Sequence, residues 1–383
     1  MTAAERYLLL GLRLGRHVHG VVDSYYGPAE LKEQADAEEL VPAEDVAADA
    51  SSLESELPDG WLRDLVHGVA TYARVLAGEA ISYADEVEAC YGVRPKRVAR
   101  EVYEQTHARL DELLPGDGTL AERRERWRTE HRMPAEKLLP VLTDVFTELR
   151  SRTRELFGLP DGEDVSVEEV HDEPWWAFNY YQGGLQSRIA VNVDVPTTYD
   201  DVLELAAHEG YPGHHTERST KEIVLVRERG ALEETINLVP TPQSVLSEGI
   251  AETAPDILGE GAREAVVRIM RRHGIEYDTE RAREIREAFK AIRGLGLDAA
   301  LLIHEDGASP DDAVEYVKRW GATSEERARQ SVRFVTDPTW RAYVITYSAG
   351  GELAAAYHRN DAARFKRLLT EPVRVSELLA AAP

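Results

Sequence analysis

The stretch LAAHEGYPGHHTE, residues 205–217, decides how the rest of the chain is interpreted. It begins with the His-Glu pair of H-E-x-x-H, a helical motif in which two histidines four residues apart bind one zinc ion. Position 212 is a proline here, and the next histidines, His214 and His215, come six and seven residues after His208. The stretch is therefore either a metal site with an inserted turn or the histidine-rich end of a helix.

A straight helix cannot bring these histidines together. Six residues turn through roughly 600°, which places His208 and His214 on different faces of the helix. His215 would lie on the same face as His208, but roughly 10 Å further along the axis, which is too far to share an ion. A shared site therefore requires a break in the helix.

The residues between the histidines permit such a break. Pro212 lacks a backbone N–H, and its ring clashes with the carbonyl four residues back, that of His208. Gly210 and Gly213 add backbone freedom on either side. A bulge or tight turn over residues 211–213 would absorb the extra residues and return a second histidine to the first. The pattern makes this geometry possible without requiring it.

Candidates for a further ligand lie in VPTPQSVLSEGIAETAPDIL, residues 239–258. Glu248 and Glu252 share one face of the helix that this segment predicts. A catalytic zinc takes three protein ligands and keeps one position open, so Glu248 is predicted to complete the set. Glu252 is predicted to accept the other ring N–H of a ligand histidine. The alternative is a solvated acidic face in an acid-rich chain.

Composition limits the classes of function. The net charge of −25 argues against nucleic-acid or anionic-membrane partners, because both need a basic surface. No run of about 18 apolar residues predicts a membrane span. Cys90 is the only cysteine, so no intrachain disulfide is possible and a reducing cytoplasm is the expected location.

The pattern along the chain predicts a mainly α protein with a small β-sheet next to the metal-binding helix. Residues 1–160 are predicted as an N-terminal helical lobe and 161–383 as the catalytic lobe, either separate or as one continuous unit. Alternating SRIAVNV, residues 187–193, is the clearest strand. TTYDDVLELAAHE, residues 197–209, carries an N-cap and first-turn acids, which predict a helix start.

HEGYPGHHTE followed by SEGIAE resembles the bacterial "domain of unknown function 885" family, which is similar to the gluzincin metallopeptidases that include thermolysin and carboxypeptidase Taq. SRIAVNVDVP upstream and YVITYSAGGELAAAY near the C-terminus extend the resemblance over most of the chain, most strongly over residues 171–258. The resemblance implies a multi-helix, zincin-like fold and a zinc-dependent peptidase activity.

The resemblance also implies roles for individual residues. His208, His214 and Glu248 become the Zn²⁺ ligands, and Glu209 becomes the general base. His215 is a reserve ligand, or a hydrogen-bond donor to the substrate if it does not bind metal.

Hydrolysis also needs a donor for the oxyanion and groups that hold the substrate. Tyr347, in TYSAGG, is the first candidate donor, and Tyr211 within the metal turn is its rival. Arg188 and Arg341 are candidates to bind a substrate carboxylate, because a guanidinium matches that geometry.

The predicted strand, residues 187–193, could pair with an extended peptide as edge strands do. Trp175 and Trp176 are candidates either to line a subsite or to pack in the core.

The resulting hypothesis is a zinc metallopeptidase that acts on a peptide or a small amide. The alternatives are a zinc-dependent hydrolase of a non-peptide amide or ester, and a catalytically silent zincin scaffold. A di-iron bundle built on Glu104/His107 and Glu168/His171 is disfavoured, because such E-x-x-H pairs are expected by chance in so acidic a chain.

Overall fold

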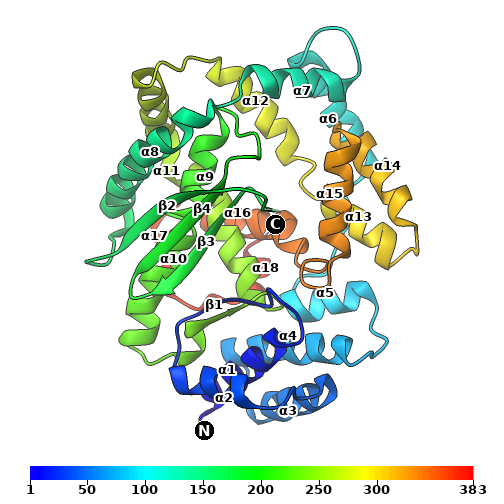
Figure 1. Cartoon of the computed structure of the whole chain (residues 1–383), viewed down its shortest axis with the longest axis vertical. Helices are drawn as coiled ribbons and strands as arrows, with labels where there is room; N and C mark the ends of the chain where they lie inside the picture. The colour runs from blue at the N-terminus through cyan, green and yellow to red at the C-terminus, as the bar shows by residue number, and fades with distance from the viewer. Residues whose placement is uncertain (174, 383) are drawn as a thin grey trace.

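Helices build most of the molecule, which confirms the expectation of a mainly α protein (Figure 1). The structure, a computed structural model, describes residues 1–173 and 175–382, so Pro174 before the paired tryptophans and Pro383 lie outside it. Within the described residues, no helix is long and apolar enough to cross a lipid bilayer.

The helices of the first half are α1 (Ala3–Gly15), α2 (Ala29–Ala37), α3 (Ala43–Glu56), α4 (Trp61–Leu76), α5 (Tyr83–Tyr91), α6 (Arg100–Leu113), α7 (Leu120–Glu130) and α8 (Ala135–Phe157). Those near the predicted metal site are α9 (Asp201–Glu209), α10 (His214–Lys221), η1 (Glu222–Arg227), η2 (Leu232–Thr235) and α11 (Pro242–Arg272). The remaining helices are α12 (Thr279–Lys290), α13 (Leu295–His304), α14 (Pro310–Gly321), α15 (Glu325–Thr336), η3 (Thr346–Gly350), α16 (Gly351–His358), α17 (Ala362–Thr370) and α18 (Val375–Ala381).

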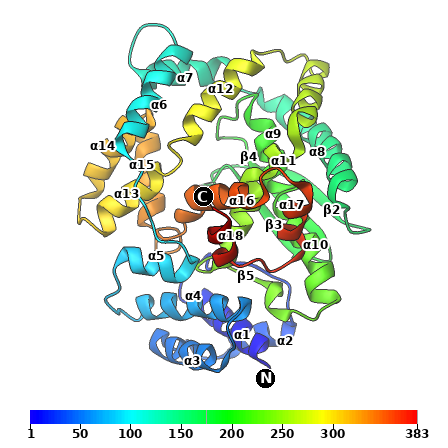
Figure 2. The ribbon, with the colours of Figure 1, turned by 180° about the vertical axis from the view of Figure 1, so that it is seen from behind.

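A single hydrophobic cluster joins the two ends of the chain. It contains Tyr7 and Leu65 from the first helices, Leu246 from α11, and Phe365 and Leu378 from the last helices. Figure 2 shows α16, α17 and α18 together on the far side of the molecule. The two predicted lobes therefore share core packing, and a division near residue 160 stays a prediction.

The small sheet has the strand order β2-β4-β3, from β2 (Asp164–Val170), β4 (Gln186–Asn192) and β3 (Ala177–Gly183). β4 is parallel to β2 and antiparallel to β3. Ile189 of β4 is fully buried with Val145 of α8 and Leu205 of α9, so the sheet lies beside the predicted metal-binding helix.

The position of β4 corrects one expectation. The alternating strand that was expected to offer an edge to a peptide is the central strand of the sheet, and β2 and β3 are its two edges. Strand order depends on pairing between distant segments, which the alternation of one segment does not specify.

A second, two-stranded sheet pairs β1 (Val22–Tyr25) with β5 (Ile236–Leu238) in antiparallel orientation. It brings the N-terminal segment against the chain that leads into α11. Ser24 pairs with Asn237, and the register shifts between Val22 and Ser24. Asp23 lies at this irregularity, beside Asn237.

Glycines set how closely the C-terminal segment approaches α11. A Cβ on Gly249 of α11 would lie 2.6 Å from the carbonyl oxygen of Gly350, and a Cβ on Gly350 would lie 2.8 Å from that of Val245. Both distances are shorter than van der Waals contact, so only glycine permits this packing. It places η3, which contains Tyr347, directly against the helix that carries Glu248.

Gly350→Ala is expected to lower the free energy of unfolding by about 1–3 kcal/mol, because the added methyl group meets backbone atoms that have no room to move. Urea unfolding measures the change. Gly261→Ala in α11 is the matched control, because its Cβ would meet only the end of the flexible Arg152 side chain, at 3.2 Å. Equal stability of the two variants would contradict the close approach.

Candidate metal centre

The helix at the start of residues 205–217 breaks where the sequence predicts. α9 ends at Glu209, and α10 begins at His214. The backbone N–H of Gly213 donates to the carbonyl of Ala207 at 2.9 Å, and that of Thr216 donates to Gly210 at 3.2 Å. These bonds join residues six apart instead of four apart, as in a regular α-helix. Residues 210–213 therefore form a bulge between the two helices.

Two glycines make this bulge possible. A Cβ on Gly213 would lie 1.9 Å from the carbonyl oxygen of His208 and 2.4 Å from that of Ala207. A Cβ on Gly210 would lie 2.5 Å from the ring of Phe146 in α8. Neither position has space for a side chain, so glycine at positions 210 and 213 is a steric requirement of the turn.

The helix start upstream differs in one detail. α9 begins where the sequence predicts, but the side chain of Asp200, its N-cap residue, makes no capping hydrogen bond. Asp200 instead pairs with Arg286 of α12, and Asp201 accepts from the backbone N–H of Thr198 at 2.7 Å.

The bulge brings His208 and His214 to Glu248. One ligand atom from each of these three residues lies within 4.8 Å of the others. Glu248 Oε2 is 3.6 Å from His208 Nε2, and Glu248 Oε1 is 3.6 Å from His214 Nε2. Among the described residues, no other group of three His, Cys, Asp or Glu side chains has its ligand atoms this close together. The predicted trio therefore converges from α9, α10 and α11.

Hydrogen bonds orient His214 within the cluster. Its Nδ1 lies 3.1 Å from Ser247 Oγ, which donates to Glu217 Oε2 at 2.6 Å. Glu217 Oε1 accepts from Lys221 Nζ at 2.7 Å. A serine that donates to a carboxylate is left to accept from Nδ1–H, so His214 presents Nε2 to Glu248. Sequence analysis missed Ser247 and Glu217, although Ser247 directly precedes Glu248.

The surroundings of His208 follow the expectation in part. Glu252 lies on the predicted side of His208, but Glu252 Oε1 is 4.0 Å from His208 Nδ1, longer than a hydrogen bond. Glu252 Oε2 is paired with Arg293 Nη1 at 2.5 Å. Glu252 is therefore positioned beside the histidine and held by an arginine that the sequence did not indicate.

Tyr343 is a further residue of the centre that sequence analysis missed. Its hydroxyl donates to Glu248 Oε1 at 2.6 Å and so orients the carboxylate. It comes four residues before Tyr347, one helical turn earlier, and this spacing was the available signal.

Burial and neighbouring charges set the protonation of the cluster. Burial raises the pKa of Glu209 to about 7 and lowers the pKa of His208 to about 4. Burial also opposes the charge on His214 and on Glu248, but each stabilises the other: the pKa of His214 rises to about 9 and that of Glu248 falls to about 2. His214 and Glu248 thus form a buried ion pair.

The cluster opens into a cavity of about 730 Å³. Glu209 and Tyr347 line it together with the three clustered residues, and Tyr347 is 36% exposed. Trp175 also lines the cavity, whereas Trp176 packs in the core and donates to Thr197 at 2.9 Å. The other aromatic residues of the wall are Phe178, Tyr181, Phe334, Trp340 and Tyr343.

His215 and Tyr211 lie away from the cavity, which corrects their expected roles. His215 is fully buried, with Nδ1 2.8 Å from Ser187 Oγ and Nε2 3.1 Å from Glu163 Oε2. Tyr211 is also fully buried, and its hydroxyl donates to Glu163 Oε2 at 2.7 Å. His215 is therefore not placed as a reserve ligand, nor Tyr211 as an oxyanion donor, because Glu163 holds both on the opposite side of the bulge.

The two arginines expected to bind a substrate carboxylate are engaged elsewhere. Arg188 pairs with Glu168 and covers the ring of Tyr180 at 4.1 Å, and Arg341 pairs with Glu86. Neither is among the described residues that line the cavity.

The metal alternative based on E-x-x-H pairs finds no support. His107 Nε2 lies 2.9 Å from the carbonyl oxygen of Trp320, and His171 Nδ1 lies 2.9 Å from Asp194. Within residues 1–173 and 175–382, neither pair joins a cluster of three ligands.

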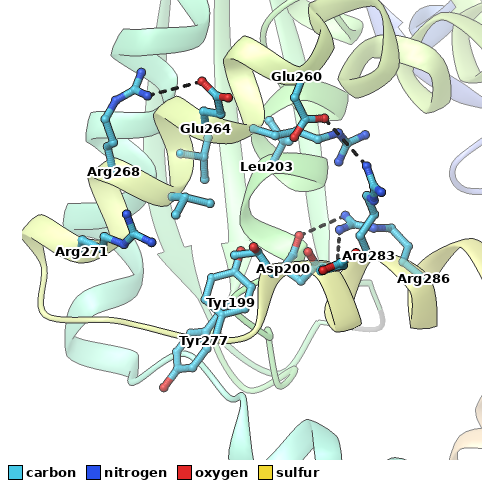
Figure 3. A pocket seen from close by; sticks show the side chains of 15 residues that line it. Tyr199, Asp200, Leu203, Glu260, Glu264, Arg268, Arg271, Tyr277, Arg283 and Arg286 are labelled. Atoms are coloured by element: carbon cyan, nitrogen blue, oxygen red, sulfur yellow. Dashed lines mark hydrogen bonds and ion pairs between the residues drawn. The ribbon is translucent and has the colours of Figure 1, made fainter. Parts of the chain in front are cut away.

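A separate cavity of about 570 Å³ lies between α9, α11 and α12 (Figure 3). Arginines and acids of its wall neutralise each other: Arg268 with Glu264 at 3.8 Å, Arg283 with Glu260 at 3.9 Å, and Arg286 with Asp200. None of the predicted site residues lines it.

Comparison with known proteins gives a likeness of fold. No protein-family model matches the chain, and no curated protein matches its sequence. The crystal structure of "the putative lipoprotein from Colwellia psychrerythraea" is similar over 92% of this chain, with a TM-score of 0.57 and 16% identity. This chain spans 63% of the length of that protein. At this identity the similarity concerns the fold and carries no function.

His215→Ala is expected to lower the free energy of unfolding by about 1–3 kcal/mol, because Glu163 and Ser187 each lose a buried hydrogen-bond partner. Chemical denaturation measures the change. His67→Ala is the control, because His67 lies on the surface beside Glu54. Unchanged stability of the His215 variant would show that His215 is not a structural residue.

Proposed function

We propose that the protein is a zinc-dependent metallohydrolase, and that its substrates are peptides. The observation that supports this most directly is the convergence of His208, His214 and Glu248 at the wall of a large cavity, with Glu209 beside them. Two imidazoles and one carboxylate are the ligand set of many catalytic zinc sites.

An unsatisfied atom in the cluster fits a cation. Glu248 Oε2 is buried and has no hydrogen-bond partner, although it faces His208 Nε2 at 3.6 Å. Buried carboxylate oxygens without a partner are rare, because desolvation is not compensated. His208, His214 and Glu248 would hold zinc, and the proton shared by His214 and Glu248 would leave as zinc binds. Zinc with an open coordination position supplies an acidified water and a Lewis acid.

Glu209 is proposed as the general base. It follows His208 directly, lines the cavity, and has no hydrogen-bond partner among the described side chains that would hold it away from a substrate. A carboxylate whose pKa is raised to about 7 can both accept a proton from water and return it to a leaving amine at neutral pH.

Tyr347 is proposed to donate to the developing oxyanion. Its ring is partly exposed to the cavity and lies 5.4 Å from that of Tyr343, centroid to centroid. The hydroxyl of Tyr343 is committed to Glu248, so the two tyrosines have different tasks. Tyr343 positions a ligand, and Tyr347 is free to contact a substrate.

An extended substrate is proposed to lie along β3. This strand is one of the two edges of the sheet, and Ala177, Phe178 and Asn179 of β3 line the cavity. The amide of Asn179 donates to the backbone carbonyl of Glu209 at 2.5 Å, which ties the strand to the metal-binding segment. Backbone groups at such an edge can pair with a peptide.

The order of these parts supports the resemblance to the "domain of unknown function 885" family and to a gluzincin, zincin-like fold. His-Glu lies on one helix, a second histidine follows the bulge, and Glu248 lies on the next long helix beside a small sheet. Membership in that family and a cytoplasmic location remain proposals. A non-peptide amide or ester would contact the same metal cluster, Glu209 and Tyr347, so it is the alternative substrate. A catalytically silent scaffold would have no need of Glu209 as a base.

His208→Ala and Glu248→Ala are each expected to reduce bound zinc from about one ion per chain to a small fraction of that, because each removes one of three ligands. Elemental analysis after dialysis measures the zinc content. His67→Ala, which removes a histidine far from the cluster, should keep the wild-type content. One zinc per chain in either ligand variant would contradict the assignment.

Glu209→Gln is expected to retain zinc and to lower the rate of hydrolysis by about 100-fold or more, because the amide cannot accept the proton of water. The assay incubates each protein with a mixed peptide library and identifies products by mass spectrometry. Undiminished cleavage by the variant would contradict the role of Glu209. Absence of cleavage by the wild type, together with bound zinc, would favour a non-peptide substrate or a scaffold.

A further inference from the structure

The cavity contains a second polar group, at the junction of β1 and β5. Asp23 of β1 and Asn237 of β5 both line the cavity, and Asn237 Nδ2 donates to Asp23 Oδ2 at 2.6 Å. An ionised carboxylate only accepts, so the amide nitrogen of Asn237 is the donor in this bond. Asn237 Oδ1 is left without a partner, although only 7% of the residue is exposed.

Asn179 of β3 presents another unpartnered oxygen in the wall of the cavity. Asn179 Nδ2 donates to the carbonyl of Glu209, so Asn179 Oδ1 is the remaining atom of that amide. It is also buried and without a partner in the described part of the chain. Two buried amide oxygens without partners and the carboxylate of Asp23 thus belong to residues that line one cavity. Buried acceptors of this kind require a donor, and a ligand can supply one.

The nearby positive charge is already balanced. Burial raises the pKa of Asp23 and opposes the charge of Glu217, and Arg218, which also lines the cavity, lowers the pKa of both carboxyls. Its Nη2 reaches Ser247 Oγ at 3.5 Å. A carboxylate ligand that approached Arg218 would be repelled by the negative charges of Asp23 and Glu217. An ammonium group would instead supply the N–H donors that the acceptors lack.

Asp23 lines the same cavity as the metal cluster, together with Glu209 and Tyr347. A group bound at Asp23 is therefore near the groups proposed to hydrolyse an amide.

We propose that Asp23 and Asn237 bind the free α-amino group of the substrate, so that the protein acts at the amino-terminal end of peptides. The ammonium group donates to the Asp23 carboxylate and to Asn237 Oδ1, and the first side chain of the substrate meets the aromatic wall of the cavity. This inference rests on the proposed function for the hydrolytic step, but the recognition of an amine does not depend on that step.

Binding tests the inference without hydrolysis. The probes are L-phenylalaninol, its N-acetyl derivative, and N-acetyl-L-phenylalanine, in which the amine is blocked and a carboxylate replaces the hydroxymethyl group. Calorimetric titration of the wild-type protein with zinc present should show that L-phenylalaninol binds about tenfold or more tightly than its N-acetyl derivative, the factor that a charged hydrogen bond provides. Equal affinities, or tighter binding of N-acetyl-L-phenylalanine, would overturn the inference; the second result would assign recognition to Arg218.

Asp23→Asn should abolish the preference for the free amine, because it removes the negative charge. The new amide oxygen can still accept from Asn237 Nδ2, so the β1–β5 pairing is kept, and thermal unfolding checks the fold. Glu173→Gln is the matched control: it removes a charge from the same cavity, but at an exposed position where solvent screens it. The comparison of probes on the wild type remains decisive if the Asp23 variant does not fold.

Hydrolysis separates this inference from the proposed function. Matched peptides with free and acetylated amino termini are incubated with the wild type, and products are identified by mass spectrometry. Release of residues from the free amino terminus alone supports both proposals. Equal cleavage of both peptides supports the hydrolase and overturns the amine site. Preferential binding of L-phenylalaninol without any cleavage supports the amine site and contradicts the peptidase.

Discussion

The approach of Gly213 to the carbonyl oxygens of Ala207 and His208 is the constraint on which the centre depends. It allows residues 210–213 to bulge out between the end of α9 and the start of α10. The backbone groups of the bulge remain bonded, through Gly213 N–H to Ala207 and Thr216 N–H to Gly210, so little hydrogen bonding is lost. Without this approach, His214 could not return to His208.

Most of the buried carboxylates around the metal cluster have a hydrogen-bond or ion-pair partner. Lys221 and Ser247 hold Glu217, Arg293 holds Glu252, and Tyr343 holds one oxygen of Glu248. A buried carboxylate without a partner is costly, so each of these pairs keeps the helices in place as well as orienting a ligand. Three of the buried atoms left unsatisfied, Glu248 Oε2 and the amide oxygens of Asn179 and Asn237, belong to residues that line the same cavity. These three atoms are the candidates to contact a ligand there.

Local geometry explains which parts of the site could be predicted. The rotation per residue of a helix shows that His208 and His214 need a break, and the Pro-Gly pattern indicates where it falls. The same rotation separates His215 from His214 by roughly 100°, which is why adjacent histidines face opposite sides of the bulge. Their destinations depend on Glu163 and Glu248, which are far away in the sequence. Arg188 and Arg341 were mistaken for substrate contacts for the same reason, since their acidic partners lie in other elements.

The sequence by itself indicated the mainly helical fold and a helix break near residues 211–213, because these follow from helix periodicity and from the sterics of proline and glycine. The choice of His208, His214 and Glu248 came from the family resemblance. Only the tertiary structure decided that β4 is the central strand and β3 one of the edges, that Tyr343 and Ser247 orient the ligands, and that Asp23 reaches the same cavity from the N-terminal segment. The physical reason is that strand pairing and buried hydrogen bonds join segments separated by tens to hundreds of residues, and no local pattern encodes which partner each segment meets.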